Sequence, residues 1–273
     1  IVEGLLNRPK PDEAILANLK ADMIKSRADA KLNQGRCFGA LQTYVFYGPD
    51  FIRRTTLTNP ALEAMSSEML LAKIGELMDK QHKVLYYGPQ SEKEVTEALA
   101  MHHKTSAELQ PLDKKHLQLL PTDESKVLMA QYDAKQLYYL QYANLGKQFD
   151  VAADPEITLY NEYFGGGMNS VVFQEMREAR GLAYSASAYI MQPNYADTKY
   201  GYYYMAFIAT QNDKMQKAIE AFDEIINNMP ESEKAFSIAK EALISRLRTD
   251  RTVKEQVLWS FIRLRNLGLE EDR

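Results

Sequence analysis

Cysteine is nearly absent from this sequence, since Cys37 is the only cysteine in 273 residues. One cysteine cannot form a disulfide within the chain, so no covalent cross-link restrains the fold. No catalytic signature surrounds Cys37. We therefore interpret it as a small hydrophobic residue that packs in the interior.

Long hydrophobic runs and a strong excess of one charge are also missing. No apolar run approaches the roughly 20 residues that a membrane-spanning helix needs. The first residues lack the charged and apolar regions of a signal peptide. The chain carries 33 Lys and Arg against 37 Asp and Glu, a formal net charge of −4. This balance does not favour nucleic acid or an anionic membrane surface as a partner.

Histidine is scarce, and its spacing argues against a metal site. His82 stands alone, and His116 lies in a polar segment. His102 and His103 are adjacent on a predicted helix, about 100° apart around its axis. They cannot share a metal ion as an i, i+4 pair does. We therefore predict no zinc site in this chain.

The composition that remains is ordinary for a globular protein, at 45% hydrophobic and 26% charged residues. A chain of this length can form two modest cores.

The first part of the sequence predicts mostly helices. The predicted elements are a helix over 11–34, a second from Phe38 to a turn at Gly48-Pro49-Asp50, a third from Ser66 or Ser67, a strand over Val84–Tyr87, and a helix that a Ser91/Glu94 capping box opens. The polar stretch Lys104–Ser125 then predicts a linker.

After the linker the pattern predicts strands followed by helices, so the expected fold class is α+β. The predicted elements are a hairpin of Val127–Tyr132 and Leu137–Ala143, a strand from Tyr200 to Thr210, a helix over 214–229 capped by Asn212, a helix from Ser232 past Leu247, and a last helix through Val257 and Ile262. Tyr200, Tyr202 and Tyr204 lie on one face of their strand. That face is either core or the floor of a peptide groove, and we favour the core.

The rest of the chain is organised around residues 154–190. Asp154 and Pro155 predict the start of a helix that runs into the three glycines Gly165, Gly166 and Gly167. Asn169 or Ser170 caps the next helix, and Gly181 ends it in a left-handed conformation. An alternating strand follows from Ala183, with Tyr184, Ala186, Ala188 and Ile190 on one face.

The triple glycine allows three interpretations. The glycines can permit positive φ angles between packed helices, without any function. Residues 165–170 can also form an anion-binding nest, although no Lys-Ser/Thr follows the glycines and no strand precedes them. In the third interpretation, the missing Cβ atoms let a peptide backbone approach closely.

Arg177 and Tyr184 flank the bend at Gly181, and the tight turn predicts that both side chains reach one edge. Taken singly, Arg177 reads as a cation at a helix C-terminus and Tyr184 as a half-buried strand residue. Together they belong to a longer pattern, Asn161–Ser170 followed by Phe173–Ser185.

This pattern resembles the C-terminal half of pitrilysin/insulinase-type zinc metallopeptidases, a family that includes the mitochondrial processing peptidase and core subunits of the bc1 complex. In that half a glycine-rich segment precedes Arg-Glu-x-x-Gly-Leu-x-Tyr, and the matching residues are Arg177, Glu178, Gly181, Leu182 and Tyr184. The resemblance implies that Arg177 and Tyr184 reach toward a zinc-bearing half and act on the scissile carbonyl. It also implies that Gly165, Gly166 and Gly167 contact substrate.

The sequence departs from the active form of the family, because His-x-x-Glu-His occurs nowhere in it. We therefore expect this chain to be inactive alone, with zinc in a partner domain or subunit and a peptide as substrate. The alternative is an inactive scaffold or peptide-binding subunit. For location, the resemblance favours the bacterial periplasm over the cytoplasm.

The resemblance implies two-layer α+β domains in tandem. Residues 1–107 then form the C-terminal part of one domain, 108–125 a linker, and 126–273 the larger part of a second. A weak similarity between segments 220 residues apart fits such a duplication; it pairs Glu13 with Glu233 and Gly48 with Gly268. Because the chain begins at Ile1, inside what reads as an unfinished element, we expect it to be part of a longer protein.

Overall fold

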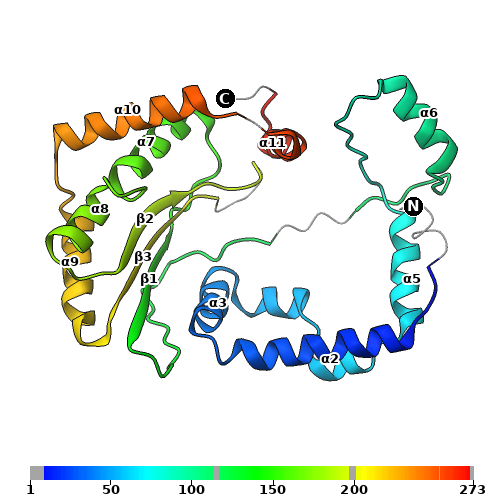
Figure 1. The fold of residues 1–273 in the computed structure, drawn as a ribbon, viewed down its shortest axis with the longest axis horizontal. Helices are drawn as coiled ribbons and strands as arrows, with labels where there is room; N and C mark the ends of the chain where they lie inside the picture. Colours follow the sequence, from blue (N-terminus) through cyan, green and yellow to red (C-terminus); the bar gives the residue numbers. More distant parts are fainter. Residues whose placement is uncertain (1–8, 113–116, 197–200, 252, 271–273) are drawn as a thin grey trace.

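The computed structural model describes residues 9–112, 117–196, 201–251 and 253–270. Its centre is an antiparallel sheet of three strands, β1 (Gln136–Asn144), β2 (Ser185–Met191) and β3 (Tyr203–Gln211), in the order β1-β3-β2 (Figure 1). In this register Ala206 of β3 lies opposite Gln141 of β1 and Ala188 of β2. The α+β class that the sequence predicts is confirmed.

One face of the sheet is covered by helices that come from the segment between β1 and β2 and from the segment after β3. They are α7 (Asp154–Phe164), α8 (Val171–Phe173) with its π-helical continuation η2 (Gln174–Ala179), and α9 (Met215–Asn227). The helix α10 (Glu233–Thr249) packs on α7. The largest fully buried side chains between these helices and the sheet include Phe164, Met176, Ile208, Phe222 and Ile225. This core fixes where α8 and η2 lie relative to β2.

The other face of the sheet is covered by α3 (Gln34–Thr55), which bends at Gly48, where φ is 67°. The ring of Phe38 packs against Tyr138 and Phe207, at centroid distances of 5.4 and 5.8 Å. Phe46 lies 4.7 Å from Tyr142, again between ring centroids. Since Ala206 and Phe207 are neighbours in β3, they point to opposite faces, and the sheet is packed on both sides.

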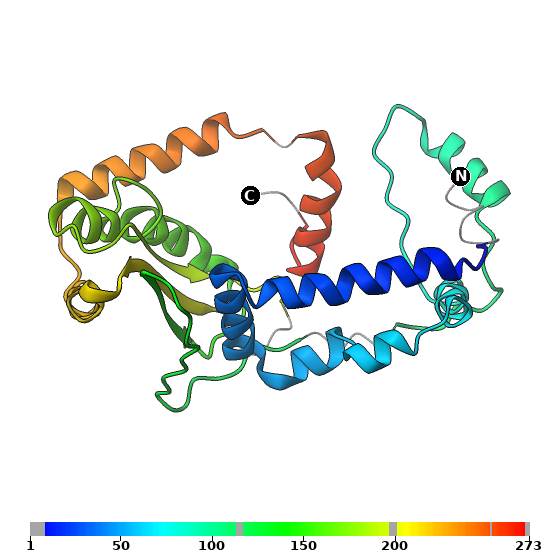
Figure 2. The ribbon, with the colours of Figure 1, turned by 60° about the horizontal axis from the view of Figure 1, so that its bottom comes forward.

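The remaining helices are α2 (Glu13–Ala30), α4 (Asn59–Glu63), α5 (Ser67–Met78), α6 (Glu92–His102) and α11 (Lys254–Asn266). Both ribbon views show α2 leading away from the sheet toward α5, with α6 farther out (Figures 1 and 2). In the part of the chain that the structure describes, no helix is long and apolar enough to cross a bilayer.

Two predicted strands are wrong. Residues 84–87 and 127–132 have no strand pairing, and Val127 is 97% exposed. The predicted hairpin is therefore absent, because β1 pairs with β3 instead. Near the first segment the structure has only an isolated parallel bridge between Lys80 and Gln110. Strand-like composition does not form a strand where no neighbouring backbone completes the ladder.

Several helix boundaries differ from the predicted ones. Asp154 is already helical, because Asp150 accepts a hydrogen bond from Ala152 N and starts the 3₁₀ turn η1 (Val151–Ala153) one turn earlier. Likewise Asn212 lies in the 3₁₀ turn η3 (Asn212–Lys214), and its side-chain amide donates to Ala134 O instead of capping α9. In contrast, the predicted Ser91/Glu94 capping box is confirmed, and the helices predicted to start at Ser66 or Ser67 and at Ser232 are capped by Ser66 and Ser232.

Tyr202 and Tyr204, from the predicted tyrosine face, pack in the interior, as predicted. Tyr202 is buried just before the strand, and its hydroxyl bonds with the backbone of Asp150. Tyr204 packs against the main core, and its hydroxyl has no partner among the described residues. Burial raises the pKa of Tyr204 and raises the pKa of nearby Tyr160 to about 12. Tyr200, where the strand was predicted to start, lies outside the described residues.

Other predicted features pack differently. The helix predicted over 11–34 buries few of its apolar side chains: in α2 Leu16 is buried, while Ile15 and Leu19 are exposed. The predicted linker is partly packed: Leu119 is buried, and Leu120 N donates to Phe46 O of α3. Cys37 is half-buried, and its thiol lies near backbone carbonyls of the α2–α3 turn.

Candidate functional site

The bend between η2 and β2 is built from backbone hydrogen bonds around one buried methionine. Met176 is fully buried, and its carbonyl accepts from both Leu182 N and Ala183 N, at 2.9 and 3.2 Å. Gly181 takes the predicted left-handed conformation, with φ of 58°. Tyr184 N then donates to Ala209 O of β3 at 2.8 Å, which ties the bend to the sheet.

This bend brings Arg177 and Tyr184 into contact. The guanidinium carbon of Arg177 lies 5.6 Å from the centroid of the Tyr184 ring and 5.0 Å from that of Phe173. These are cation–π distances. The Arg177 side chain is 45% exposed and Tyr184 is 73% exposed. A cation and a phenol therefore stand side by side at the surface, and Phe173 also contacts the cation.

The chemistry of this pair is hydrogen-bond donation. Arg177 has five N–H groups in a planar fork, and the ion pair that the described residues offer it is a long one, with Nε 3.6 Å from Glu178 Oε1. The Tyr184 hydroxyl adds another donor. Two such donors suit a carbonyl oxygen, a carboxylate or an oxyanion, which they would stabilise most as negative charge develops.

A second arginine, Arg180, occupies the same bend but is held differently. Its Nη1 donates to Glu224 Oε2 of α9 at 2.7 Å, and its Nε lies 3.5 Å from Glu175 Oε2. The hydrogen bond to Glu224 raises the pKa of Arg180. The sequence did not separate the roles of the two arginines, because both lie near the end of the same predicted helix.

The three glycines are not equivalent. A Cβ atom on Gly165 would lie 1.8 Å from Ala188 O, so this buried glycine lets α7 end against the backbone of β2. A Cβ on Gly166 would lie 2.6 Å from Asn161 O, whereas one on Gly167 would meet nothing within 4 Å. None of the three has positive φ, so that part of the packing interpretation is wrong. Close approach, not left-handed backbone, explains Gly165.

The anion-nest interpretation of residues 165–170 gains no support. Ser170, rather than Asn169, caps α8, since its hydroxyl accepts from Phe173 N. Ser170 N itself donates to Gly167 O at 3.0 Å. Two N–H groups that a nest would direct at a ligand are therefore already bonded within the turn.

Asn161 is a residue of this region that the sequence reasoning missed. Its side-chain amide accepts from Ile190 N at 2.8 Å and donates to Ile190 O at 2.9 Å. β2 is an edge strand of the described sheet, so this amide satisfies the backbone where no further strand pairs. The available signal was the four-residue spacing from Asn161 to Gly165, which places both on one side of α7.

The histidines include one contact that the sequence did not predict. His82 does not stand alone: its Nε2 lies 2.7 Å from His103 Nε2, because the end of α6 returns to the segment after α5. His116 is outside the described residues. Across the residues that are described, no group of three or more His, Cys, Asp or Glu side chains could hold a metal ion.

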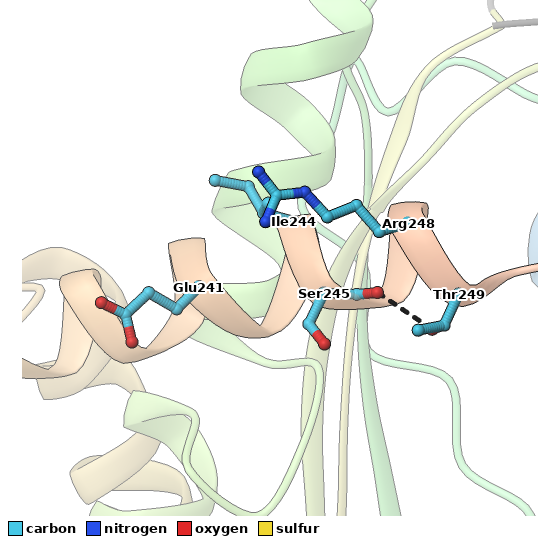
Figure 3. A pocket seen from close by; sticks show the side chains of 5 residues that line it. All are labelled: Glu241, Ile244, Ser245, Arg248 and Thr249. Carbon is cyan, nitrogen blue, oxygen red and sulfur yellow. Dashed lines mark hydrogen bonds between the residues drawn. The ribbon is translucent and has the colours of Figure 1, made fainter.

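Two hollows on the surface of the described residues do not suggest a small-molecule site. The first, of about 390 Å³, is lined by five residues of α10 alone: Glu241, Ile244, Ser245, Arg248 and Thr249 (Figure 3). One helix cannot enclose a ligand, and the Thr249 hydroxyl is bonded to Ser245 O. A second hollow, of about 510 Å³, lies beside the bend and is lined by residues that include Arg180, Leu182 and Glu224.

Comparison with known proteins gives consistent results. The family model described as peptidase M16 inactive domain matches residues 80–243. A search of curated proteins found no match. Among solved structures, a peptidase M16 inactive domain from Pseudomonas fluorescens is 17% identical with a TM-score of 0.66, and the match covers 98% of this chain and 63% of that one.

A second similar structure is the ferredoxin protease FusC, solved as a mutant in complex with Arabidopsis ferredoxin. It is 12% identical with a TM-score of 0.63, and the match covers 97% of this chain and 29% of that one. A conserved protein from Enterococcus faecalis V583 is 14% identical, with a TM-score of 0.51 over 86% of this chain and 54% of that one. This chain thus spans less than two thirds of each of these proteins, and these identities show a shared fold.

The family match assigns the chain to a family, which the low identities to solved structures cannot do. It covers more than half of the chain and includes the glycines, Arg177 and Tyr184. The resemblance to pitrilysin/insulinase-type peptidases that the motif predicts is thereby confirmed. The chain belongs to the M16 peptidase family, as a non-catalytic part described as its inactive domain.

Proposed function

We propose that this chain is the non-catalytic portion of a zinc metalloendopeptidase, and that Arg177 and Tyr184 complete an active site shared with a zinc-bearing domain or subunit. The observation that carries the proposal is the contact of two exposed hydrogen-bond donors at one bend, 5.6 Å from guanidinium carbon to ring centroid. The described residues do not fit a zinc site. The metal therefore belongs to the partner in this proposal.

The role proposed for the pair is to bind the oxygen of the scissile carbonyl. Attack on a peptide bond places negative charge on that oxygen, and a guanidinium with a neighbouring phenol stabilises the charge. The rings of Phe173 and Tyr184 against the guanidinium restrict its motion, so less side-chain entropy is lost when substrate binds. Donors held in place in this way favour the transition state over the free substrate.

In this proposal two of the three glycines, Gly166 and Gly167, contact the substrate. Gly166 and Gly167 are exposed, and Gly167 has open space where a side chain would be. A peptide backbone can therefore approach them closely. Gly165 is buried against β2, so it positions the loop and does not itself contact the substrate.

The test is peptide cleavage by the complete protein or by the chain reconstituted with its partner. We expect Arg177→Ala and Tyr184→Phe each to lower kcat about 100- to 1,000-fold, the usual effect of losing one oxyanion donor. Matched controls are Arg53→Ala and Tyr44→Phe, because both side chains are exposed on α3.

The outcomes separate the two hypotheses for this chain. Full activity in both the Arg177 and Tyr184 variants would refute the proposed roles. If the wild-type assembly binds peptides without cleaving them, and its partner also lacks His-x-x-Glu-His, the alternative of an inactive peptide-binding scaffold is correct.

A further inference from the structure

The bend that carries Arg177 and Tyr184 is fastened to the rest of the domain by a residue that the proposed function does not use. We propose that Arg180 is a positioning residue, which bridges Glu175 and Glu224 and thereby holds Arg177 and Tyr184 at their mutual distance. This inference rests on the proposed function, because it concerns the geometry of that site.

The contacts of Arg180 join η2 to α9. Its backbone N–H donates to Glu175 O at 3.2 Å, which closes the wide turn of η2. Its side chain binds Glu224 Oε2 at 2.7 Å and approaches Glu175 Oε2 at 3.5 Å. Glu175 belongs to η2 and Glu224 to α9, so one guanidinium links the turn to a helix of the main core. The Arg180 side chain is 33% exposed and that of Glu224 is 60% exposed, so this link lies at the surface.

The local backbone explains why such a link is needed. A π-helical turn is rarer than an α-helical one and is frequent at functional sites, where surrounding contacts maintain it. Other groups hold the carbonyls that follow η2: Lys214 Nζ donates to Gly181 O at 3.1 Å, and Thr210 Oγ1 donates to Leu182 O at 2.6 Å. These bonds fasten the Tyr184 side of the bend to β3 and η3. Arg180 fastens the Arg177 side to α9.

The expected effect of losing this link is on geometry more than on stability. Ion pairs at the surface contribute little to the stability of a fold, so the domain stays folded without this one. The turn would then move relative to β2, and a displacement of about 1 Å in a catalytic group can lower turnover about 100-fold. Substrate binding elsewhere would be affected less, so kcat is expected to fall more than KM rises.

The experiment compares Arg180→Gln and Glu224→Gln with Arg246→Gln in the reconstituted assembly. Arg246 is the matched control, because it forms a 2.8 Å ion pair with Glu162 that joins α10 to α7 away from the bend. We expect the first two variants to lower kcat about 10- to 100-fold with melting temperatures close to that of the control. Arg180→Lys, which keeps the charge but reaches one carboxylate, should recover part of kcat.

A second measurement does not depend on activity. Hydrogen exchange of the Gly181, Leu182 and Ala183 amides, which bond to carbonyls of η2, should become about 10-fold faster in Arg180→Gln and stay unchanged in Arg246→Gln. Unchanged exchange at these amides would overturn the inference. So would a wild-type kcat in Arg180→Gln when Arg177→Ala is impaired, and that result would leave the proposed function standing. If exchange accelerates while Arg177→Ala keeps full activity, Arg180 does position the bend and the proposed function alone fails.

Discussion

At the scale of single residues, the space around each glycine decides its role. Gly165 lies where a Cβ atom would overlap the carbonyl and the N–H of Ala188, at 1.8 and 2.5 Å. Backbone atoms of a paired strand cannot move aside as a flexible side chain can. Gly167, two residues later, has no atom within 4 Å of the same position. The same motif thus contains one packing glycine and one open glycine.

This difference gives a paired prediction. We expect Gly165→Ala to lower the free energy of unfolding by about 1–3 kcal/mol or more, because α7 must move away from β2. Gly167→Ala should change it by less than about 0.5 kcal/mol, as surface substitutions usually do. Urea denaturation of both variants measures the difference. Equal stabilities would mean that α7 does not end against β2 as described.

Residue types also explain which parts of the site were predictable. Arg177 and Tyr184 are seven residues apart around a glycine, and that spacing alone predicted that they share an edge. Phe173 and Arg180 looked like ordinary helix residues. Their contacts depend on the π-helical turn and on Glu224, which is 44 residues farther along the chain. Local patterns contain no information about such partners.

At the scale of elements, a side chain protects the edge of β2 that pairs with no other strand among the described residues. The amide of Asn161 bonds both backbone groups of Ile190, and the end of α7 lies against Ala188. An unprotected edge strand tends to pair with other chains. The helix that precedes the glycine loop therefore also closes the edge of the strand that follows it.

Removing the amide tests this function of α7. We expect Asn161→Ala to destabilise the fold by about 1–3 kcal/mol, because Ile190 loses both partners. Asn161→Asp should lose less, since a carboxylate still accepts from Ile190 N. Hydrogen exchange of the Ile190 amide should be fast in the alanine variant and slow in the aspartate variant. Equal protection in all three proteins would contradict the proposed bonding.

The pairing of β1 shows that the sequence pattern predicted a strand but not the strand that pairs with it. Residues 137–143 were correctly predicted as a strand, but their predicted partner, 127–132, was wrong. The actual partner β3 begins about 60 residues later in the chain and lies between β1 and β2. Periodicity indicates that a segment is extended, whereas its neighbour is chosen by the packing of the whole sheet.

At the scale of the whole molecule, α3 from the first part of the chain covers one face of the sheet that the second part forms. The aromatic face of the sheet, with Tyr142, Tyr203 and Phe207, is covered by Phe38 and Phe46 of α3. Leu120 N also donates to Phe46 O, so the segment after α6 returns to the same helix. The contact between α3 and the sheet is therefore part of the structural unit.

A substitution in α3 should weaken the contact between α3 and the sheet before the main core is affected. We expect Phe46→Ala to cost about 3–5 kcal/mol, the usual effect of removing a buried aromatic ring. Hydrogen exchange should accelerate in α3 and near Leu120 before it does so in β3 and α9. Tyr44→Ala is the control on the same helix, because Tyr44 is 43% exposed whereas Phe46 is 8% exposed. Uniform acceleration throughout the chain would indicate a single cooperative unit.

The sequence by itself determined the local features of this protein. Ser66, Ser91 and Ser232 capped their helices, Gly48 and Gly181 turned the chain, and the Arg-Glu-x-x-Gly-Leu-x-Tyr pattern led to the family. Each of these depends on interactions between residues a few positions apart, so each is visible in the order of residues.

Only the tertiary structure decided the rest. The order β1-β3-β2, the burial of Gly165, the amide of Asn161 on Ile190 and the bridge from Arg180 to Glu224 all join segments that are distant in the chain. Such contacts form when burial of the shared core brings elements together, and no single segment specifies that arrangement.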